Sequence, residues 1–224
     1  MRARFSAKGA LGLHLTIGVL VTILFAWWFS EIAESLGPTT AQVALDHRVT
    51  NWFHAHARPG LTSAFRVLTF FGSVGFVTGM SVLGAIFFAL RKRWGRLLAL
   101  VCTMLGGSLL NILLKHFFHR QRPILENPLV TLKSFGFPSG HTMGSTMLYG
   151  VLALILVQSL RNPWARLLAA LAAVALIGAV GLSRIYLGAH YLTDVLGAIA
   201  IGGAWLAFIW TTVETFRRRR DRAK

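Results

Sequence analysis

The chain lacks most of what holds a soluble or disulfide-bonded protein together. It has one cysteine, Cys102, so a disulfide within the chain is impossible. Only 13% of its 224 residues are charged, and only seven residues are acidic. With 55% hydrophobic residues and a mean hydropathy of +0.62, the composition is too apolar for an ordinary soluble domain. We therefore expect an integral membrane protein.

The charge that is present is strongly positive, with a formal net charge of +16 and a pI near 11.7. Nucleic-acid binding would place basic residues along one face of a domain. Here they occur in short blocks between apolar stretches, which is typical of the connections between membrane helices. We therefore expect no nucleic acid among the partners.

Six apolar segments are close to the length that a membrane helix needs, which is about 20 residues for about 30 Å of hydrocarbon. They cover residues 11–29, 68–90, 97–114, 142–160, 165–182 and 191–212. The first ends in the bulky residues Trp27, Trp28 and Phe29, where small residues would favour signal cleavage, so we expect it to be retained. The sequence predicts an all-α, polytopic bundle of six transmembrane helices that forms one domain over residues 1–224.

The distribution of basic residues predicts the orientation of this bundle. With the N-terminus inside, 15 of the 23 Lys and Arg residues fall on the inner side, including the tail residues 217–224. The outer side receives the other eight and five of the seven acidic residues. The excess of positive charge marks the cytoplasmic side, so we expect both termini in the cytoplasm.

Two outer connections are longer than simple turns. In the first, segment 43–54 has apolar residues at helical spacing with polar residues between them, which predicts an amphipathic helix at the membrane interface. This helix could be a lid that packs on the bundle or a gate for lipid entry. The second connection, residues 115–139, is dense in charge and histidine.

The third apolar segment is followed by a cluster of cations. Asn111, Lys115 and His119 are four residues apart, so they would share one face if the helix extends that far. A cation at the membrane interface usually has a partner and indicates a functional site. Lys115 alone could also extend its side chain to water without any such role.

The stretch Pro138, Ser139, Gly140, His141 stands directly before the fourth apolar segment. The first N–H groups of a helix have no acceptor within the helix and lie at its positive end, so they bind phosphate readily. Gly140 would allow close approach of the anion, and His141 would stand beside it as a proton donor. In isolation, these residues could equally be an ordinary N-cap serine followed by a histidine.

The last cluster precedes the sixth segment. His190 and Asp194 are four residues apart, so the carboxylate can hold one imidazole nitrogen and leave the other free to attack. Arg184 offers a planar guanidinium that suits phosphate oxygens. The predicted topology puts all three clusters at helix ends on the outer side.

These residues resemble the type 2 phosphatidic acid phosphatase superfamily (PAP2), whose membrane members are lipid phosphate phosphatases. Its three motifs match in order within residues 115–194. The first motif, a lysine with a later Arg-Pro, matches Lys115, Arg122 and Pro123. The second, Pro-Ser-Gly-His, matches residues 138–141. The third, Ser-Arg followed by His and Asp, matches Ser183, Arg184, His190 and Asp194. The ordered set is far more specific than any single motif.

The resemblance implies a phosphohydrolase that needs no metal or other cofactor and acts through a phosphohistidine. His190 would be the nucleophile, Asp194 the group that orients it, and His141 the acid that protonates the leaving oxygen. The phosphoryl oxygens would be bound by Lys115, Arg122, Ser139, Gly140 and Arg184. Arg120 and Lys133 match no motif position, and we interpret them as headgroup contacts or surface charge.

Three other functions are compatible with parts of the sequence. A zinc enzyme would use outer histidines, of which His116 and His119 alone have helical ligand spacing, with no acidic residue among them. A lipid-phosphate transporter is compatible with six helices, but the ionisable residues gather at one surface and the two halves are not inverted copies. A phosphotransferase with the same intermediate differs only in the acceptor.

The location of the site predicts a lipid substrate, because the acyl or polyprenyl chain can stay in the bilayer while the headgroup reaches the cations. The resemblance suggests undecaprenyl diphosphate, phosphatidylglycerol phosphate or phosphatidate. We favour undecaprenyl diphosphate, because an outward site suits recycling of a lipid carrier. The expected location is the inner (plasma) membrane, with the active site on the periplasmic or extracellular side.

Overall fold

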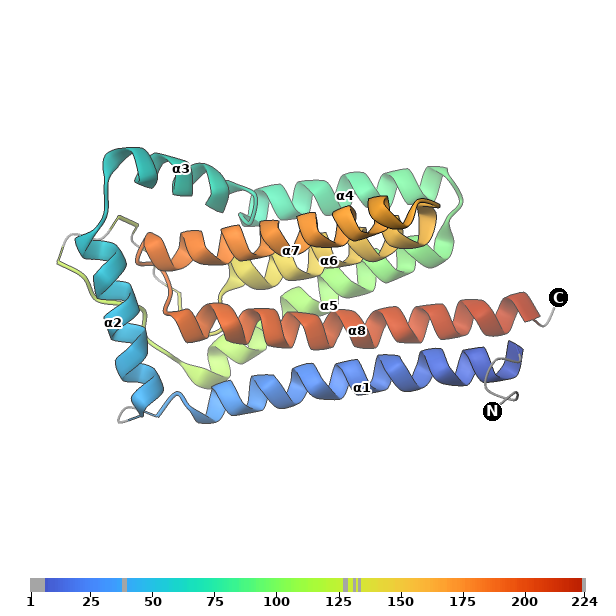
Figure 1. Cartoon of the computed structure of the whole chain (residues 1–224), viewed down its shortest axis with the longest axis horizontal. Helices are drawn as coiled ribbons and strands as arrows, with labels where there is room; N and C mark the ends of the chain where they lie inside the picture. The colour runs from blue at the N-terminus through green and yellow to red at the C-terminus, as the bar shows by residue number, and fades with distance from the viewer. Residues whose placement is uncertain (1–6, 38–39, 127–128, 131, 133, 223–224) are drawn as a thin grey trace.

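The structure, a computed structural model, describes residues 7–37, 40–126, 129–130, 132 and 134–222. Arg2, Arg4 and Lys224, which belong to the basic residues predicted on the inner side, and Lys133, which matches no motif position, lie outside these residues. The described residues form eight helices (Figure 1): α1 (Ala7–Glu34), α2 (Ala41–Ala55), α3 (Pro59–Phe70), α4 (Val74–Leu90), α5 (Trp94–Phe118), α6 (Gly140–Ser159), α7 (Pro163–Tyr186) and α8 (Leu192–Arg222).

Six stretches of the described chain are long and apolar enough to cross a membrane, as the sequence predicted. They correspond to α1, to α3 and α4 together, and to α5, α6, α7 and α8. Most are longer than the apolar segments, because helices continue into the polar residues at their ends. The basic tail, for example, is the last part of α8.

The second span differs from the predicted segment 68–90. It begins at Pro59 and is divided into α3 and α4 by a short break. Pro59 suits the first position of a helix, and the Ser73 side chain caps α4 by accepting a hydrogen bond from the Phe76 N–H. The prediction missed α3 because its apolar residues are interrupted by polar ones.

The helix predicted for segment 43–54 is present as α2, which begins at the N-cap Thr40. It lies across one end of the long helices and packs on α7 and α8 (Figure 1). Its polar side does not face water throughout, because Asp46 is completely buried. This carboxylate holds α2 to α8, because it accepts hydrogen bonds from the N–H and the hydroxyl of Thr193.

The helix α5 ends one residue before His119, which adopts a left-handed conformation with φ of 47°. The expectation that Asn111, Lys115 and His119 share one helical face is therefore wrong for His119. Its side chain is exposed, whereas Asn111 and Lys115 are half-buried on the α6 side of α5.

The core lies mainly between α4, α5, α6 and α8, where Leu100, Met143, Met147 and Leu148 are almost fully buried. α1 packs along α8 at the side of this core (Figure 1). The end of α5, the start of α6 and the start of α8 all lie at the end of the bundle covered by α2. The first turn of α1 and the last turn of α8 lie at the opposite end.

Candidate active site

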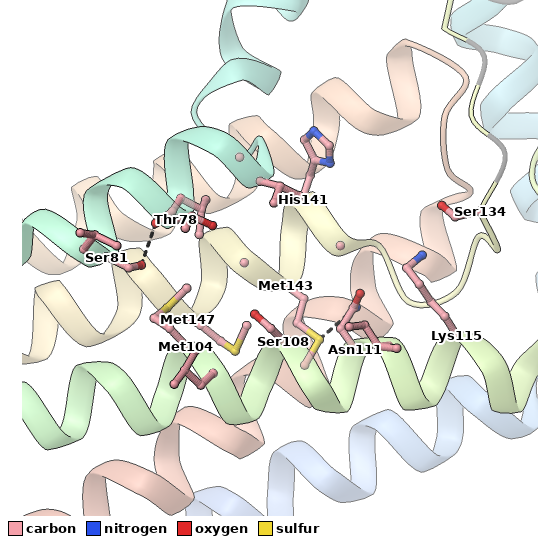
Figure 2. Close-up of a pocket in the computed structure, with 18 of the residues that line it drawn as sticks. Thr78, Ser81, Met104, Ser108, Asn111, Lys115, Ser134, His141, Met143 and Met147 are labelled. Carbon is pink, nitrogen blue, oxygen red and sulfur yellow. Dashed lines mark hydrogen bonds between the residues drawn. The ribbon is translucent and has the colours of Figure 1, made fainter. Parts of the chain in front are cut away.

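Residues from all three motifs line one cavity of about 580 Å³. Its polar end is formed by Lys115 of α5, Arg122 of the following segment, Gly140 and His141 of α6, and His190. Figure 2 shows Lys115 and His141 near this end. Segments that are 75 residues apart in sequence, such as those of Lys115 and His190, therefore contribute to one site.

His190 and Asp194 lie next to one another as their spacing suggested. Nδ1 of His190 is 3.3 Å from Oδ2 of Asp194, and both side chains are buried. The same Oδ2 accepts the Tyr191 N–H at 2.9 Å. The start of α8 thereby fixes the carboxylate against the ring, which is an arrangement that orients an imidazole for chemistry.

The partner on the other side of the ring determines its tautomer. Nη1 of Arg122 lies 3.0 Å from Nε2 of His190. An arginine side chain has donors only, so Nε2 must accept and carries the lone pair, while Nδ1 carries the proton and donates to Asp194. The nitrogen with the nucleophilic lone pair is therefore the one that faces the cavity cation.

Burial lowers the pKa of His190 to about 4, although the hydrogen bond and the charge of Asp194 act in the opposite direction. Arg122 and Arg184 add to the lowering through their positive charge. Burial also lowers the pKa of Arg122, with Asp194 opposing it. The ring is thus neutral at physiological pH, which is the form that a nucleophile needs.

Lys115 and Arg122 are aimed at the polar end of the cavity by the segment before α6. Lys115 Nζ donates to the Phe135 carbonyl at 2.6 Å. Arg122 donates to the carbonyls of Ser134 and Ala189, each at 2.6 Å. Carbonyl oxygens thus hold both cations at the polar end of the cavity. Within the described ranges neither cation forms an ion pair with a carboxylate, which favours an anion between them.

The start of α6 has the N-terminal geometry expected for the Pro-Ser-Gly-His stretch, with one difference. Ser139 is the N-cap and is fully buried; its hydroxyl accepts from Thr142, and its own N–H donates to the Asp194 carbonyl at 3.1 Å. The Ser139 N–H is therefore already used. The N–H groups of Gly140 and His141, at the first two positions of the helix, have no acceptor within it.

Arg184 is placed differently from the other motif cations. It is 3% exposed and donates from Nη1 to the Thr69 hydroxyl at 2.7 Å. Its Nε atom is buried without a partner among the described residues. Arg184, Ser139 and Asp194 do not line the cavity itself, whereas the other five predicted site residues do.

Sequence reasoning missed the role of Arg120, which it interpreted as a headgroup contact or surface charge. The structure corrects this: Arg120 donates to Asp194 Oδ1 at 2.6 Å and to Asp46 Oδ2 at 2.7 Å, and its side chain is 12% exposed. The indication available in the sequence was the scarcity of acidic residues. An acidic residue within an otherwise lipid-directed segment, such as Asp46, needs a cation partner.

Beyond the cations, the cavity is apolar and runs along α5 between α4 and α6. Figure 2 shows Met104 and Met147 at its far side, with Ser81 of α4 beyond them. From Lys115 to Val101, both in the lining, α5 rises about 21 Å at 1.5 Å per residue. The lining residues Val82, Leu105 and Ile112 are more than half exposed, so the cavity is open between α4 and α5.

No group of three His, Cys, Asp or Glu side chains within the described ranges is arranged to hold a metal ion. His116 and His119, the pair with possible ligand spacing, contact the Phe135 ring edge-on.

Comparison with known proteins agrees with this site. A family model described as "PAP2 superfamily" matches residues 96–218, more than half of the chain. Phosphatidylglycerophosphatase B of Bacillus subtilis is 36% identical over 170 residues, which cover 73% of this chain and 81% of the relative. Decaprenylphosphoryl-5-phosphoribose phosphatase of Mycobacterium tuberculosis is 29% identical over 75% of this chain and 86% of the relative.

A solved structure extends the similarity to the fold. The crystal structure of a transmembrane PAP2 type phosphatidylglycerolphosphate phosphatase from Bacillus subtilis superposes with a TM-score of 0.76 at 32% identity, covering 89% of this chain and 96% of that one. Family motifs, helices and fold thus agree along most of the sequence. The chain belongs to the PAP2 superfamily and is a multi-pass membrane lipid phosphatase of that type.

Proposed function

We propose that this phosphatase hydrolyses the terminal phosphomonoester of phosphatidylglycerol phosphate through a phosphohistidine at His190. The observation that carries the proposal is the single cavity that has His190, Lys115 and Arg122 at one end and a long apolar lining at the other. Such a cavity suits a molecule with a phosphate head and a hydrocarbon chain.

The phosphate would lie between Lys115, Arg122 and the first N–H groups of α6 at Gly140 and His141. These donors line the same cavity as His190, whose Nε2 lone pair faces Arg122. Arg122 already contacts Nε2, so an oxygen bound to Arg122 would bring the phosphorus atom close to this nitrogen. The same donors would stabilise the charge of the transition state. The buried Arg184 and the N-cap Ser139 would support this arrangement without lining the cavity.

The chemistry then needs two steps. His190 Nε2 attacks phosphorus while the bond to the lipid oxygen breaks, and His141 donates a proton to that oxygen. Asp194 stabilises the positive charge on the ring through Nδ1–H. In the second step, water gives a proton to His141 and attacks phosphorus, and the P–N bond breaks to release inorganic phosphate and restore neutral His190.

The proposed substrate, phosphatidylglycerol phosphate, replaces undecaprenyl diphosphate, which the sequence alone favoured. The similar phosphatidylglycerophosphatase B and the similar solved structure, both from Bacillus subtilis, are named for this lipid. The apolar part of the cavity suits its acyl chain, and the opening between α4 and α5 would admit the chain from the bilayer. Undecaprenyl diphosphate and phosphatidate remain the comparison substrates.

The basic residues support an orientation with both termini in the cytoplasm and the site on the outer face. The active-site end carries α2, and the opposite end carries the arginine-rich end of α8 (Figure 1). Positive charge favours the cytoplasmic side. The arginines near the end of α8 would contact anionic lipid there.

Phosphate release by purified protein from a panel of the three lipids tests the activity. We expect the fastest release from phosphatidylglycerol phosphate, unchanged rates in excess chelator, and none from His190→Ala. Loss of activity in chelator would indicate a metal enzyme. Phosphorylated lipid in place of free phosphate would indicate a phosphotransferase.

The role of the apolar cavity needs a separate test. Ser108 lines it, and its neighbour Leu109 is exposed on α5 outside the lining. We expect Ser108→Phe to fill the cavity and raise KM for the lipid, with little effect on a short-chain, water-soluble substrate. Leu109→Phe is the matched control and should leave both unchanged; equal effects of the two variants would contradict the chain-binding role.

A further inference from the structure

The strongest feature outside the motif residues is a buried ion network that joins α2 to the His190–Asp194 pair. Arg120 bridges two carboxylates, Asp46 of α2 and Asp194 of α8, at 2.7 and 2.6 Å. Both carboxylates are 0% exposed. Buried charges of this kind are costly unless they are paired and fully hydrogen-bonded.

The carboxylate of Asp194 has no free oxygen. Arg120 occupies Oδ1, while Oδ2 faces the Tyr191 N–H and Nδ1 of His190. With Oδ1 held, the group cannot rotate and Oδ2 stays directed at the ring. In the described part of the chain, Arg120 is the one Lys or Arg side chain that forms an ion pair with Asp194.

Arg120 is itself held from two further directions. Asp46 binds its other amino group and also accepts hydrogen bonds from the N–H and the hydroxyl of Thr193. The Tyr191 ring lies under the guanidinium, 4.8 Å from its carbon atom. A planar group that bridges two carboxylates over an aromatic face is a position for Arg that Lys cannot reproduce.

We propose that Arg120, held by Asp46, is a positioning residue that fixes the orientation and charge of Asp194 for the reaction at His190. The proposal rests on the proposed phosphohistidine function. It also gives α2 a role: the outer helix supplies the carboxylate that holds Arg120, so the docking of α2 and the geometry of the nucleophile are coupled.

The charges of Arg120 and Asp46 should affect proton binding by the His190–Asp194 pair, an effect that a purely structural contact would not have. Removing the positive charge of Arg120 makes it easier for the His190–Asp194 pair to bind a proton, whereas removing the negative charge of Asp46 makes it harder. The acid limb of the kcat/KM profile should therefore move to higher pH in Arg120→Gln and in the opposite direction in Asp46→Asn. The other ionisable groups near the pair are common to both variants: Lys115, Arg122, His141, Arg184 and Tyr191.

The experiment measures phosphate release from phosphatidylglycerol phosphate by the purified full-length variants over a range of pH. We expect kcat of Arg120→Gln to fall about 10- to 100-fold, by analogy with the loss of groups that orient the ligands of a metal site, with little change in KM. Arg120→Lys should restore activity only in part. Arg48→Gln is the control, since it also removes an arginine charge but Arg48 is exposed on α2, the helix that carries Asp46, and it should behave as the wild type.

Two further measurements separate positioning from folding. Guanidinium ion added to Arg120→Ala should restore part of the activity, because it can occupy the site of the lost group. The double variant Asp46→Asn/Arg120→Gln should lose less than the product of the single losses, because the residues act as a unit. Should Arg120→Gln fail to fold, Asp46→Asn still tests the shift of the acid limb to lower pH, while Arg120→Lys, which keeps the positive charge, should lower kcat with little shift of the limb.

Wild-type kcat and pH profile in folded Arg120→Gln would overturn the inference. So would a loss of activity in both variants with an unshifted acid limb and no guanidinium rescue. A wild-type protein that forms no phosphohistidine would instead refute the proposed function, so the two failures are distinguishable.

Discussion

Nδ1 of His190 lies 3.3 Å from Oδ2 of Asp194, while Arg122 approaches the opposite ring nitrogen at 3.0 Å. Because arginine only donates, this pair of contacts fixes the ring as the Nδ1–H tautomer with a lone pair on Nε2. The nucleophilic nitrogen therefore follows from the hydrogen bonds around the ring. The proposed attack on phosphorus requires this geometry.

The first prediction concerns this tautomer. In Asp194→Asn, the amide can present its NH₂ group to Nδ1, which favours a ring protonated on Nε2 and removes the nucleophilic lone pair. We expect kcat to fall by about 10⁴-fold, as for the same change in a serine protease triad. The measurement is steady-state phosphate release, with a folded protein shown by its thermal unfolding. A variant with more than a tenth of wild-type kcat would show that the tautomer is not controlled by Asp194.

The lowered pKa of His190 predicts how stability depends on pH. The free imidazole binds a proton near pH 6.5, whereas the buried ring does so only near pH 4. Between these values the unfolded state binds more protons, so the free energy of unfolding falls as the pH falls from about 6.5 to 4. Thermal unfolding in detergent at several pH values checks this. His190→Gln lacks the group and should lose less stability over the same range; equal losses would contradict the shift.

Replacing Gly140 should weaken phosphate binding without changing the stability of the fold. A Cβ atom there would lie 3.4 Å from Oδ1 of Asn111 and 4.0 Å from Cε of Lys115, which are ordinary contacts. The added methyl group would nevertheless occupy the polar end of the cavity, where the phosphate should approach the backbone. We expect Gly140→Ala to keep the wild-type melting temperature and to raise KM or weaken inhibition by inorganic phosphate about tenfold, equivalent to about 1.4 kcal/mol. Unchanged binding would remove Gly140 from the phosphate site.

Replacing Gly107 should instead destabilise the fold, because this glycine lies where α5 contacts α6. A Cβ atom there would lie 1.9 Å from the Met147 sulfur, so the helices or the side chain must shift. We expect Gly107→Ala to destabilise the fold by about 1–3 kcal/mol, as overpacking does. Gly178→Ala on α7, where no atom lies within 4 Å, is the matched control. A melting temperature of Gly107→Ala equal to that of the control would contradict the close packing.

The sequence predicted the helices well where one physical rule governs them. Six apolar stretches had to be helical to satisfy their backbone in a bilayer, and the amphipathic pattern of 43–54 identified α2. The predicted helix boundaries were less accurate where polar residues interrupt an apolar stretch or where a turn ends a helix early. α3 carries polar residues within an apolar span, and His119 ends α5 in a left-handed turn that periodicity does not register.

The candidate site shows the same division. His190 contacts Asp194, as their four-residue spacing predicted. Lys115 and His141, which belong to two different motifs, line the same cavity. The pairing of Arg120 with Asp46 joins residues 74 positions apart through the docking of α2, which no local spacing encodes. The Ser139 N–H, at a residue expected to bind phosphate, instead donates to the Asp194 carbonyl, another contact between distant residues that local spacing does not encode.

The most direct test of the central claim is to trap the phosphoenzyme. Wild-type protein mixed rapidly with phosphatidylglycerol phosphate and quenched in base should carry one acid-labile phosphoryl group on the peptide that contains His190. Neither His190→Ala nor Lys115→Ala/Arg122→Ala, which lacks the two cavity cations, should accumulate it. A phosphoryl group on another residue, or full phosphate release by His190→Ala, would contradict the account.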